Sequence, residues 1–474
     1  MTRCGVLAIC LLVSSGPYVL PATAETNYFR HDGGVATNDG PSPPDHFDDP
    51  NRLLWRRPLP SGHSTPCVAG RLLVLTTFEG ERTLATVAVD RETGSTVWRQ
   101  EAPNDRLEPY HRVGSPAAST PASDGERVFV FLGSYGLLCY DLQGALLWSK
   151  PMGPFQDEFG SASSAVLADG KVILSQDHDT DSFVMAVDAA TGETVWKTAR
   201  PDATRSYATP VIYQQGDEKF VVVTGALQLT AYNLETGEPR WWLTGLARIA
   251  NTTPAQADNV LYVATWSPGG GTSARIAMEA WSEAVAAYDK NADRNITRDE
   301  LPEASPVLLR FFRIDLNQDG KLGEAEWNKH AEVFRRATNG VLAVRPSGRG
   351  DLRQTDVKWA YRKGVPFVAS PLLYQNVLYL VKDGGIATTL DPRTGALYRQ
   401  RRLPGRGNYY ASPVAADGKI YIASARGVLS VLEAGPRWKL LSSRDFGEPI
   451  YATPVIDGER IYVRTAAALY CFAK

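Results

Sequence analysis

The chain has 474 residues, a formal net charge of −2, 43% hydrophobic residues and 22% charged residues. This near balance of charge gives no reason to expect a nucleic-acid partner, and the length predicts either two domains or one large repeat architecture. Glycine (41), tryptophan (11) and tyrosine (20) are plentiful while methionine (4) is scarce. Such a composition is typical of many short strands joined by glycine-bearing turns.

Residues 1–24 have the pattern of a signal peptide. Arg3 gives a positive start, residues 6–13 form an apolar core too short to span a bilayer, and Ala22-Thr23-Ala24 matches an A-x-A cleavage site. Cys10 follows a bulky isoleucine, which disfavours a lipid anchor at that cysteine. No other segment is apolar enough to cross a membrane. The sequence therefore predicts an exported protein, periplasmic or secreted, with an N-terminal linker at 25–50.

Three cysteines follow the predicted cleavage site: Cys67, Cys139 and Cys471. They are far apart, odd in number and without C-x-x-C spacing, so neither a disulfide framework nor a zinc site is indicated. We expect small buried side chains in strands.

A two-part motif recurs along the rest of the chain. Its first half reads AVDRETGSTVW at 88–98, AVDAATGETVW at 186–196 and AYNLETGEPRW at 231–241, and its second half is Ser-Pro or Thr-Pro before a short strand pair. The glycine supplies the positive φ of a tight turn, and the tryptophan can wedge between neighbouring units. The tryptophan-type positions number eight: Trp55, Trp98, Trp148, Trp196, Trp241, Trp359, Tyr398 and Trp438. The second half gives seven sites and a decayed eighth: Thr65, Thr120, Thr209, Thr253, Ser370, Ser412, Thr453 and, decayed, Ser164.

A period of about 45 residues with four strand signals predicts propeller blades. The fold class expected is therefore all-β, an eight-bladed β-propeller. Because Trp55 precedes the first Thr-Pro site and no tryptophan strand follows residues 468–472, we expect residues 53–57 to supply the last strand of the final blade. That pairing would close the ring and leave no sheet edge at the seam.

These motifs resemble the pyrroloquinoline-quinone-like (PQQ-like) repeat family of eight-bladed propellers, over about residues 50–270 and 338–474. The resemblance implies the fold rather than one function, because the family includes quinoprotein dehydrogenases, outer-membrane assembly proteins of the BamB type and other exported proteins.

The fifth unit is interrupted between its second and third strands. Propeller segments are expected at 51–275 and 338–474, and a small α-helical insertion at 276–337. Residues 268–272 read as a flexible linker, and residues 277–288 as a helix with Trp281 on its apolar face. Apolar pairs at 308–309 and 311–312, with Trp327, would bury the helix faces.

Two twelve-residue stretches in the insertion, DKNADRNITRDE at 289–300 and DLNQDGKLGEAE at 315–326, match the EF-hand loop. Calcium prefers six to eight oxygen ligands, and side chains together with a backbone carbonyl at position seven can supply them. Ile296 and Leu322 occupy position eight, where paired loops join through a short β-contact. The cofactor expected is Ca²⁺, with these ligand residues: Asp289, Asn291, Asp293, Asn295, Glu300, Asp315, Asn317, Asp319, Lys321 and Glu326. The second loop, with Gly320 at the sharp turn where the first has Arg294, is expected to bind better.

Two weaker patterns carry other interpretations. Residues 176–181 combine histidine and aspartates that could bind a metal, but a solvated turn is the simpler expectation. Arg349-Gly350-Asp351 spells an adhesion tripeptide that short glycine loops also produce by chance. Hydrolase, zincin and P-loop motifs are absent from the sequence.

Aromatic residues recur two positions before several of the Ser/Thr-Pro sites. Tyr207, Tyr410 and Tyr451 stand there, with His63 and Asn251 at the equivalent positions of other blades. Eightfold geometry would gather them at one mouth of the central channel, either as strand-start packing or as a rim that binds a ligand or peptide.

The leading hypothesis for function is a non-enzymatic, exported, calcium-binding propeller that docks a protein or polymer partner. One alternative is a quinoprotein dehydrogenase, although the adjacent cysteines that the resemblance implies for quinone binding are missing here. Another is a BamB-like outer-membrane assembly factor.

Overall fold

The computed structural model describes residues 26–36, 41–268 and 278–474. The predicted signal peptide and Cys10 lie outside these residues, as do most of the predicted glycine linker and the first residue of the predicted helix at 277–288. Across the described residues, no helix is long and apolar enough to cross a membrane.

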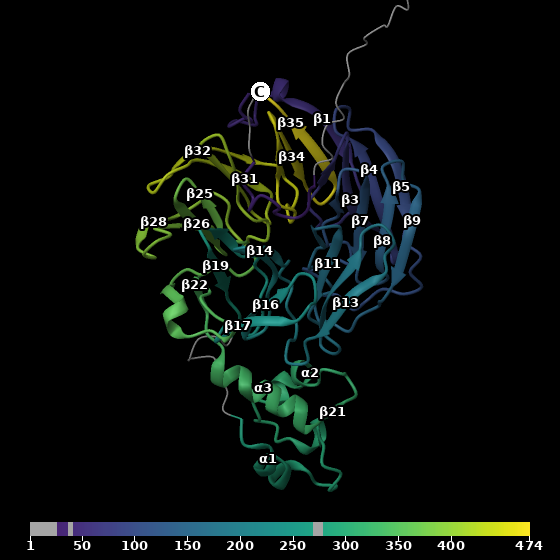
Figure 1. The fold of residues 1–474 in the computed structure, drawn as a ribbon, viewed down its shortest axis with the longest axis vertical. Helices are drawn as coiled ribbons and strands as arrows, with labels where there is room; N and C mark the ends of the chain where they lie inside the picture. The colour runs from purple at the N-terminus through teal and green to yellow at the C-terminus, as the bar shows by residue number, and fades with distance from the viewer. Residues whose placement is uncertain (1–25, 37–40, 269–277) are drawn as a thin grey trace, which may run out of the picture.

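Eight antiparallel sheets, numbered here as blades 1 to 8 along the chain, are arranged radially around a common centre (Figure 1). The prediction of an eight-bladed β-propeller is confirmed. Blade 1 consists of β2 (Cys67–Ala69), β3 (Leu72–Glu79), β4 (Thr83–Asp90) and β5 (Thr96–Glu101), and blade 2 of β6 (Ala122–Ser123), β7 (Arg127–Leu132), β8 (Gly136–Asp141) and β9 (Leu146–Pro151). Blade 3 consists of β10 (Val166–Ala168), β11 (Lys171–Gln176), β12 (Phe183–Asp188) and β13 (Thr194–Ala199), and blade 4 of β14 (Val211–Gln215), β15 (Glu218–Thr224), β16 (Gln228–Asn233) and β17 (Pro239–Thr244).

Blades 5 to 8 follow the same order, with the insertion inside blade 5 and the seam in blade 8. Blade 5 consists of β18 (Ala255–Ala257), β19 (Val260–Thr265), β22 (Gly340–Val344) and β24 (Val357–Tyr361), and blade 6 of β25 (Leu372–Tyr374), β26 (Val377–Lys382), β27 (Ile386–Leu390) and β28 (Leu397–Arg402). Blade 7 consists of β29 (Val414–Ala416), β30 (Lys419–Ala423), β31 (Val428–Glu433) and β32 (Lys439–Asp445), and blade 8 of β33 (Val455–Asp457), β34 (Arg460–Arg464), β35 (Ala468–Phe472) and β1 (Leu53–Pro58). A short 3₁₀ helix, η1 (Pro50–Arg52), leads into β1.

The Ser/Thr-Pro sites form a circle of hydrogen bonds around the channel. In seven of the eight blade-to-blade steps, the backbone N–H of one site donates to the hydroxyl of the next blade's site, at 2.9–3.2 Å. Ser164, the decayed copy, takes part at both its N–H and its hydroxyl. A Ser or Thr is needed at this position because its hydroxyl accepts the next blade's backbone donor in a buried place.

The tryptophan of one blade covers the glycine turn of the next. Trp148 donates its indole N–H to the Ala189 carbonyl at 3.1 Å, and a Cβ added at Gly192 would lie 2.7 Å from that indole ring. The Asp188 carboxylate accepts the backbone N–H groups of the turn. The same arrangement of indole and glycine recurs for four more pairs: Trp55 with Gly94, Trp98 with Gly144, Trp196 with Gly237 and Trp359 with Gly395.

Blades 4 and 5 meet differently. Blade 5 has no Thr-Gly turn between β22 and β24, and its longer loop contributes β23 (Gly350–Asp351), which pairs in parallel with β17 at Trp241 and Trp242. Leu352 is buried and donates its N–H to the Trp242 carbonyl. Gly350 and Asp351 of the Arg349-Gly350-Asp351 tripeptide are therefore part of a contact between blades.

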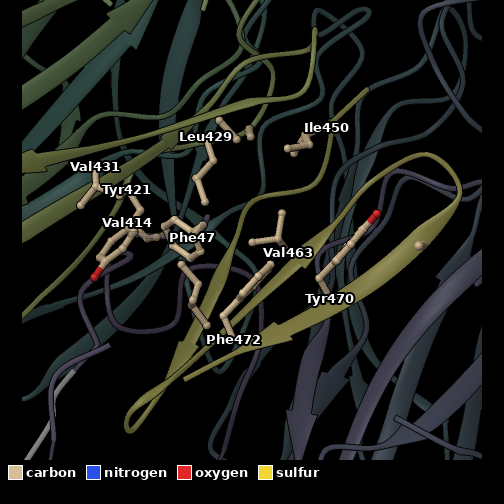
Figure 2. Packing of buried hydrophobic residues seen from close by; sticks show 13 residues of the cluster. Phe47, Val414, Tyr421, Leu429, Val431, Ile450, Val463, Tyr470 and Phe472 are labelled. Atoms are coloured by element: carbon tan, nitrogen blue, oxygen red, sulfur yellow. The ribbon is translucent and has the colours of Figure 1, made fainter. Parts of the chain in front are cut away.

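Apolar side chains fill the spaces between adjacent blades. Between blades 7 and 8, Phe47 from the N-terminal segment packs among Tyr421, Val463 and Phe472 (Figure 2). Its ring lies 5.1 Å from that of Phe472 in an edge-to-face contact. The three cysteines in the described residues are unpaired and buried, in β2, β8 and β35.

The insertion joins β19 to β22, which are themselves paired, and lies outside the ring beside β17 and β22 (Figure 1). It contains α1 (Trp281–Tyr288), β20 (Ile296–Thr297), η3 (Arg298–Glu300), η4 (Leu308–Arg310), α2 (Phe311–Ile314), β21 (Lys321–Leu322) and α3 (Glu324–Arg336). It has a core of its own around Trp281, Phe311 and Trp327. Leu309 (85% exposed) and Phe312 (51%) point outward, so the expectation that both residues of each apolar pair are buried was wrong.

The loop of blade 5 between β22 and β24 also holds η5 (Gln354–Asp356), which leads into β24. The Asp356 carboxylate accepts the N–H of Arg353 at 2.9 Å and closes this turn.

Candidate functional site

One end of the central channel opens into a cavity of about 230 Å³. The five residues singled out before the Ser/Thr-Pro sites all line it: His63, Tyr207, Asn251, Tyr410 and Tyr451. They are brought together because each stands four positions before the innermost strand of its blade, and these strands surround the common axis. The long connections after β5 and β9 add Val113 and Phe159 to the same wall.

Three of these residues form a stack along one side of the cavity. The ring of His63 lies 4.2 Å from that of Tyr451, and Tyr451 lies 5.7 Å from Tyr410, both in stacked orientation. Asn408 donates to the Tyr410 hydroxyl at 2.7 Å, which fixes the outer ring of the stack. A flat side chain or ring could extend this stack with little loss of entropy, because the rings are already ordered.

The described lining of this cavity contains no lysine, arginine, aspartate or glutamate. Its only titratable side chains are tyrosines and His63, and burial followed by the charge of Arg464 lowers the pKa of His63 to about 3. Hydroxyls from the Ser/Thr-Pro circle supply the polar atoms. The cavity is therefore neutral at physiological pH and suits an uncharged or aromatic group rather than an ion.

A part of the channel that sequence reasoning missed is its other end, which residues 27–36 cross. Arg30 donates to the carbonyls of Pro371 at 2.6 Å and Pro413 at 3.1 Å, and Asn27 and Val35 form β-bridges with Ser123 and Ala415. Phe29 from this segment reaches the cavity. Nothing in the repeat pattern pointed to this segment, because it lies outside every copy of the repeat.

Buried ion pairs lie behind Tyr207. Its hydroxyl donates to Asp157 at 2.6 Å, while Asp177 pairs with Arg200 and Asp179 with Arg205. The carboxylates at 177 and 179 are thus bound by guanidinium groups, and the metal interpretation of residues 176–181 was wrong. The solvated-turn expectation was also wrong, because Asp177, His178 and Asp179 are all buried.

The two loops that match the EF-hand pattern repeat the same internal hydrogen bonds. At position one, Asp289 accepts the N–H of Arg294 and Asp315 that of Gly320, both at 2.9 Å. At position twelve, Glu300 and Glu326 each accept the N–H groups of positions two and nine. Ile296 pairs with Leu322 across β20 and β21, as expected for position eight. Each loop therefore curls its acidic oxygens toward its own centre.

The loops differ at their sharp turn. Position six has φ +60° at Arg294 and +83° at Gly320, and position four is also left-handed in both, at Ala292 and Gln318. A non-glycine residue in this region costs about 1–2 kcal/mol. The first loop has two such strained residues, Ala292 and Arg294, whereas the second has one, Gln318.

The donor set fits a hard cation, although not by carboxylates alone. Asp289 Oδ1 is buried and has no hydrogen-bond partner, which is the state of an oxygen available to a metal. In the part of the chain that the structure describes, no three His, Cys, Asp or Glu side chains converge on a metal position, so asparagine and backbone oxygens would have to contribute. Lys321 forms an ion pair with Asp293 at 3.1 Å and competes for one ligand of the first loop.

The insertion rests on the same end of the ring as the cavity. Arg313 pairs with Glu158 at 3.4 Å, and Lys329 donates to the Pro201 carbonyl at 2.6 Å. Glu158 also pairs with Arg205, two residues from Tyr207. The insertion is thus connected to the channel wall through two ion pairs that share Glu158.

Comparison with known proteins agrees with this architecture. A family model described as "Outer membrane protein assembly factor BamB" matches residues 47–180, 83–241 and 180–473, together nearly the whole ring. The outer membrane protein assembly factor BamB of Shewanella oneidensis is 22% identical over 271 residues, 53% of this chain. That match spans 66% of the relative's own length, just under two thirds.

Two solved structures share the fold at low identity. BamB from Moraxella catarrhalis is 12% identical with a TM-score of 0.52, over 96% of this chain and 99% of that one. Quinohemoprotein alcohol dehydrogenase from Comamonas testosteroni is also 12% identical, with a TM-score of 0.55 over 89% and 76% of the two chains. The family match across the ring and the eight repeated blades lead to one conclusion: this chain belongs to the BamB family of PQQ-like β-propellers.

Proposed function

We propose that the protein is an exported, calcium-binding propeller that holds a protein partner at the channel mouth without catalysing a reaction. The observation that carries the proposal is the neutral cavity with its His63–Tyr451–Tyr410 stack. Loops on a rigid scaffold are where binding usually resides, and ordered aromatic rings give contact area at low entropy cost. The partner would insert an uncharged or aromatic segment.

The insertion would form one wall of this docking face. Leu309, 85% exposed on η4, offers an apolar contact, and Arg313 and Lys329 fix the insertion to the ring. Calcium in the two loops would stiffen this wall, held by the oxygens of Asp315, Asp319 and Glu326 in the second loop. Membership of the BamB family supports an envelope location, and the assembly role in the relative's name makes an outer-membrane protein the partner class to test first.

A quinoprotein dehydrogenase is the weaker candidate. Pyrroloquinoline quinone carries several carboxylates, and the described cavity lining offers no cationic side chain to receive them. The cysteines of the described residues lie in β2, β8 and β35, and none of them lines the cavity. These residues do not fit the quinone, and likeness to the alcohol dehydrogenase concerns the fold alone.

Site-specific photo-crosslinking in the native envelope tests the docking proposal. A photoreactive residue at Val113, which lines the cavity, should give discrete crosslinked species that mass spectrometry identifies. The same residue at Val195, which is 46% exposed against 38% for Val113 and lies on the outer strand β13, is the matched control. Crosslinks at 195 and none at 113 would move the docking surface to the outer rim.

The identified partner then allows a quantitative test. Tyr410→Ala with Tyr451→Ala should weaken binding by more than about 1 kcal/mol while the melting temperature of the ring changes little, since both side chains face the cavity. Full affinity in the double variant would show that the stack takes no part.

A further inference from the structure

A second, much smaller cavity lies where the insertion meets the ring. Its walls come from the connections after β13 and β17 on the ring side and from α2 and α3 on the insertion side. Its volume is about 20 Å³. Since one water molecule needs about 10–15 Å³, this space holds one small ion or a water molecule or two, and excludes sugars, nucleotides and peptides.

The side chains around this cavity are mostly cationic. Arg205, Arg248, Arg313, Lys329 and His330 line it, against one acid, Glu326. Both carboxylate oxygens of Glu326 accept backbone N–H groups of its own loop, so this acid is engaged by the loop. Burial and the surrounding arginines lower the pKa of His330 to about 3, which leaves the imidazole neutral and the arginines as the charges.

The carboxylates near the cavity do not balance these charges. Asp179 pairs with Arg205, and Glu158 is shared between Arg205 and Arg313. Lys329 donates to a carbonyl rather than to an acid. Counting Glu326, three carboxylates thus face three arginines and a lysine, and the excess is one positive charge.

Arg248 is the group without a counterion. Its backbone N–H donates to Ser267, but among the described residues its guanidinium has neither a hydrogen-bond acceptor nor an ion pair. Burial, then the charges of Arg205 and Arg313, lower the pKa of Arg248 to about 10. The guanidinium remains protonated at physiological pH, and a partly buried cation beside like charges is destabilising unless an anion offsets it.

We propose that this cavity binds a small inorganic anion of the size of chloride, held by Arg248 together with Arg313 and Lys329. A water molecule fits the space equally well but carries no charge to offset the guanidinium. Larger oxyanions exceed the volume. The bound anion would join cations from the ring, Arg248, and from the insertion, Arg313 and Lys329, and so fasten the insertion to the channel face.

Bromide, which replaces chloride and scatters anomalously, tests the site directly. Crystals of the full chain grown in sodium bromide should show an anomalous peak within contact distance of the Arg248 guanidinium. A cavity without this peak, in crystals that show bromide elsewhere, overturns the proposal.

Thermal unfolding with calcium held constant provides the second test. Chloride at 150 mM should raise the melting temperature by about 1–3 °C over gluconate at equal ionic strength, because gluconate is too large to enter. Arg248→Gln should abolish this difference, whereas Arg336→Gln, which removes an arginine of α3 paired outside the cavity with Glu332, should keep it. Equal chloride effects in all three proteins would refute the site. If Arg248→Gln fails to fold, the bromide experiment on the unaltered chain still decides.

Discussion

Trp55, in the first strand along the chain, is paired with Cys471 in the last strand along the chain. Its indole donates to the Arg91 carbonyl at 3.2 Å and covers Gly94 of blade 1. One tryptophan therefore both completes blade 8 and fastens it to blade 1. The closure expected from the order of the motifs thus rests on the pairing of β1 with β35 and on the contact of Trp55 with blade 1.

Trp55→Ala should lower the free energy of unfolding of the whole ring by roughly 2–3 kcal/mol, since it removes a half-buried indole and the closing contact. Denaturant unfolding followed by tryptophan fluorescence and circular dichroism measures the change. Leu54→Ala is the control, because Leu54 is 45% exposed on the same strand and should shift stability by less than about 0.5 kcal/mol. Deleting residues 25–58 should destabilise the ring further. A deletion that melts like the full chain would contradict closure by β1.

The glycine turns give a second, matched comparison. Gly170 and Gly192 both have φ near +71° to +74°, but only Gly192 lies against an indole, that of Trp148, while no atom surrounds the Cβ position at Gly170. Gly170→Ala should cost about 1 kcal/mol of unfolding free energy for the left-handed backbone. Gly192→Ala should cost about 1–3 kcal/mol more, because the indole must move. Equal costs would show that the turn needs glycine for its backbone alone.

The part of this architecture that could be predicted from the sequence is the part whose contacts recur at the spacing of the repeat. Trp148 with Gly192 and Ser164 with Thr209 are neighbours one repeat apart, so a recurring motif was enough to predict the ring, its closure and the gathering of Tyr207, Tyr410 and Tyr451. The internal hydrogen-bond pattern of the two loops that match the EF-hand is likewise local.

The contacts that sequence reasoning missed have no repeated counterpart. Arg30 reaches two carbonyls more than 340 positions away, and β23 pairs with β17 only because the turn of blade 5 is lengthened. The cations Arg248 and Arg313 meet only after the insertion has docked on the ring. Each depends on one tertiary arrangement, which no periodicity in the sequence encodes.

The buried Glu108 makes stability depend on pH. Burial raises its pKa from 4.5 to about 8; Asp157 adds to this rise and a hydrogen bond from Ser161 opposes it. Between those two values the folded state keeps a proton that the unfolded state has released. Stability from this group is therefore present below pH 4.5 and falls as the pH rises toward 8, by at most about 1.4 kcal/mol per pH unit.

Glu108→Gln should remove this loss, since glutamine cannot ionise and keeps an oxygen for the Ser161 hydroxyl. Melting temperatures of both proteins between pH 5 and 8.5 measure it, and the variant should gain on the unaltered protein as pH rises. A constant difference between the two curves across this range would contradict a raised pKa at Glu108.

Calcium binding should be unequal between the two loops. The second loop has glycine at its sharp turn, whereas the first places Arg294 at φ +60° and has Asp293 paired with Lys321. With dissociation constants of about 0.1–1 mM, as in extracellular modules, calcium at about 1 mM would add roughly 0.4–1.4 kcal/mol to the stability of the insertion.

Calorimetric titration of Glu326→Gln should lose the tighter site, while Glu300→Gln should retain it. Lys321→Met should tighten the weaker site, because it releases the Asp293 carboxylate and leaves the backbone carbonyl of position seven in place. Undiminished stoichiometry and affinity in Glu326→Gln would refute the assignment of these loops to calcium. If Lys321→Met still binds calcium more tightly when Glu300→Gln is also present, the ion pair of Lys321 with Asp293 does not compete with calcium at the first loop.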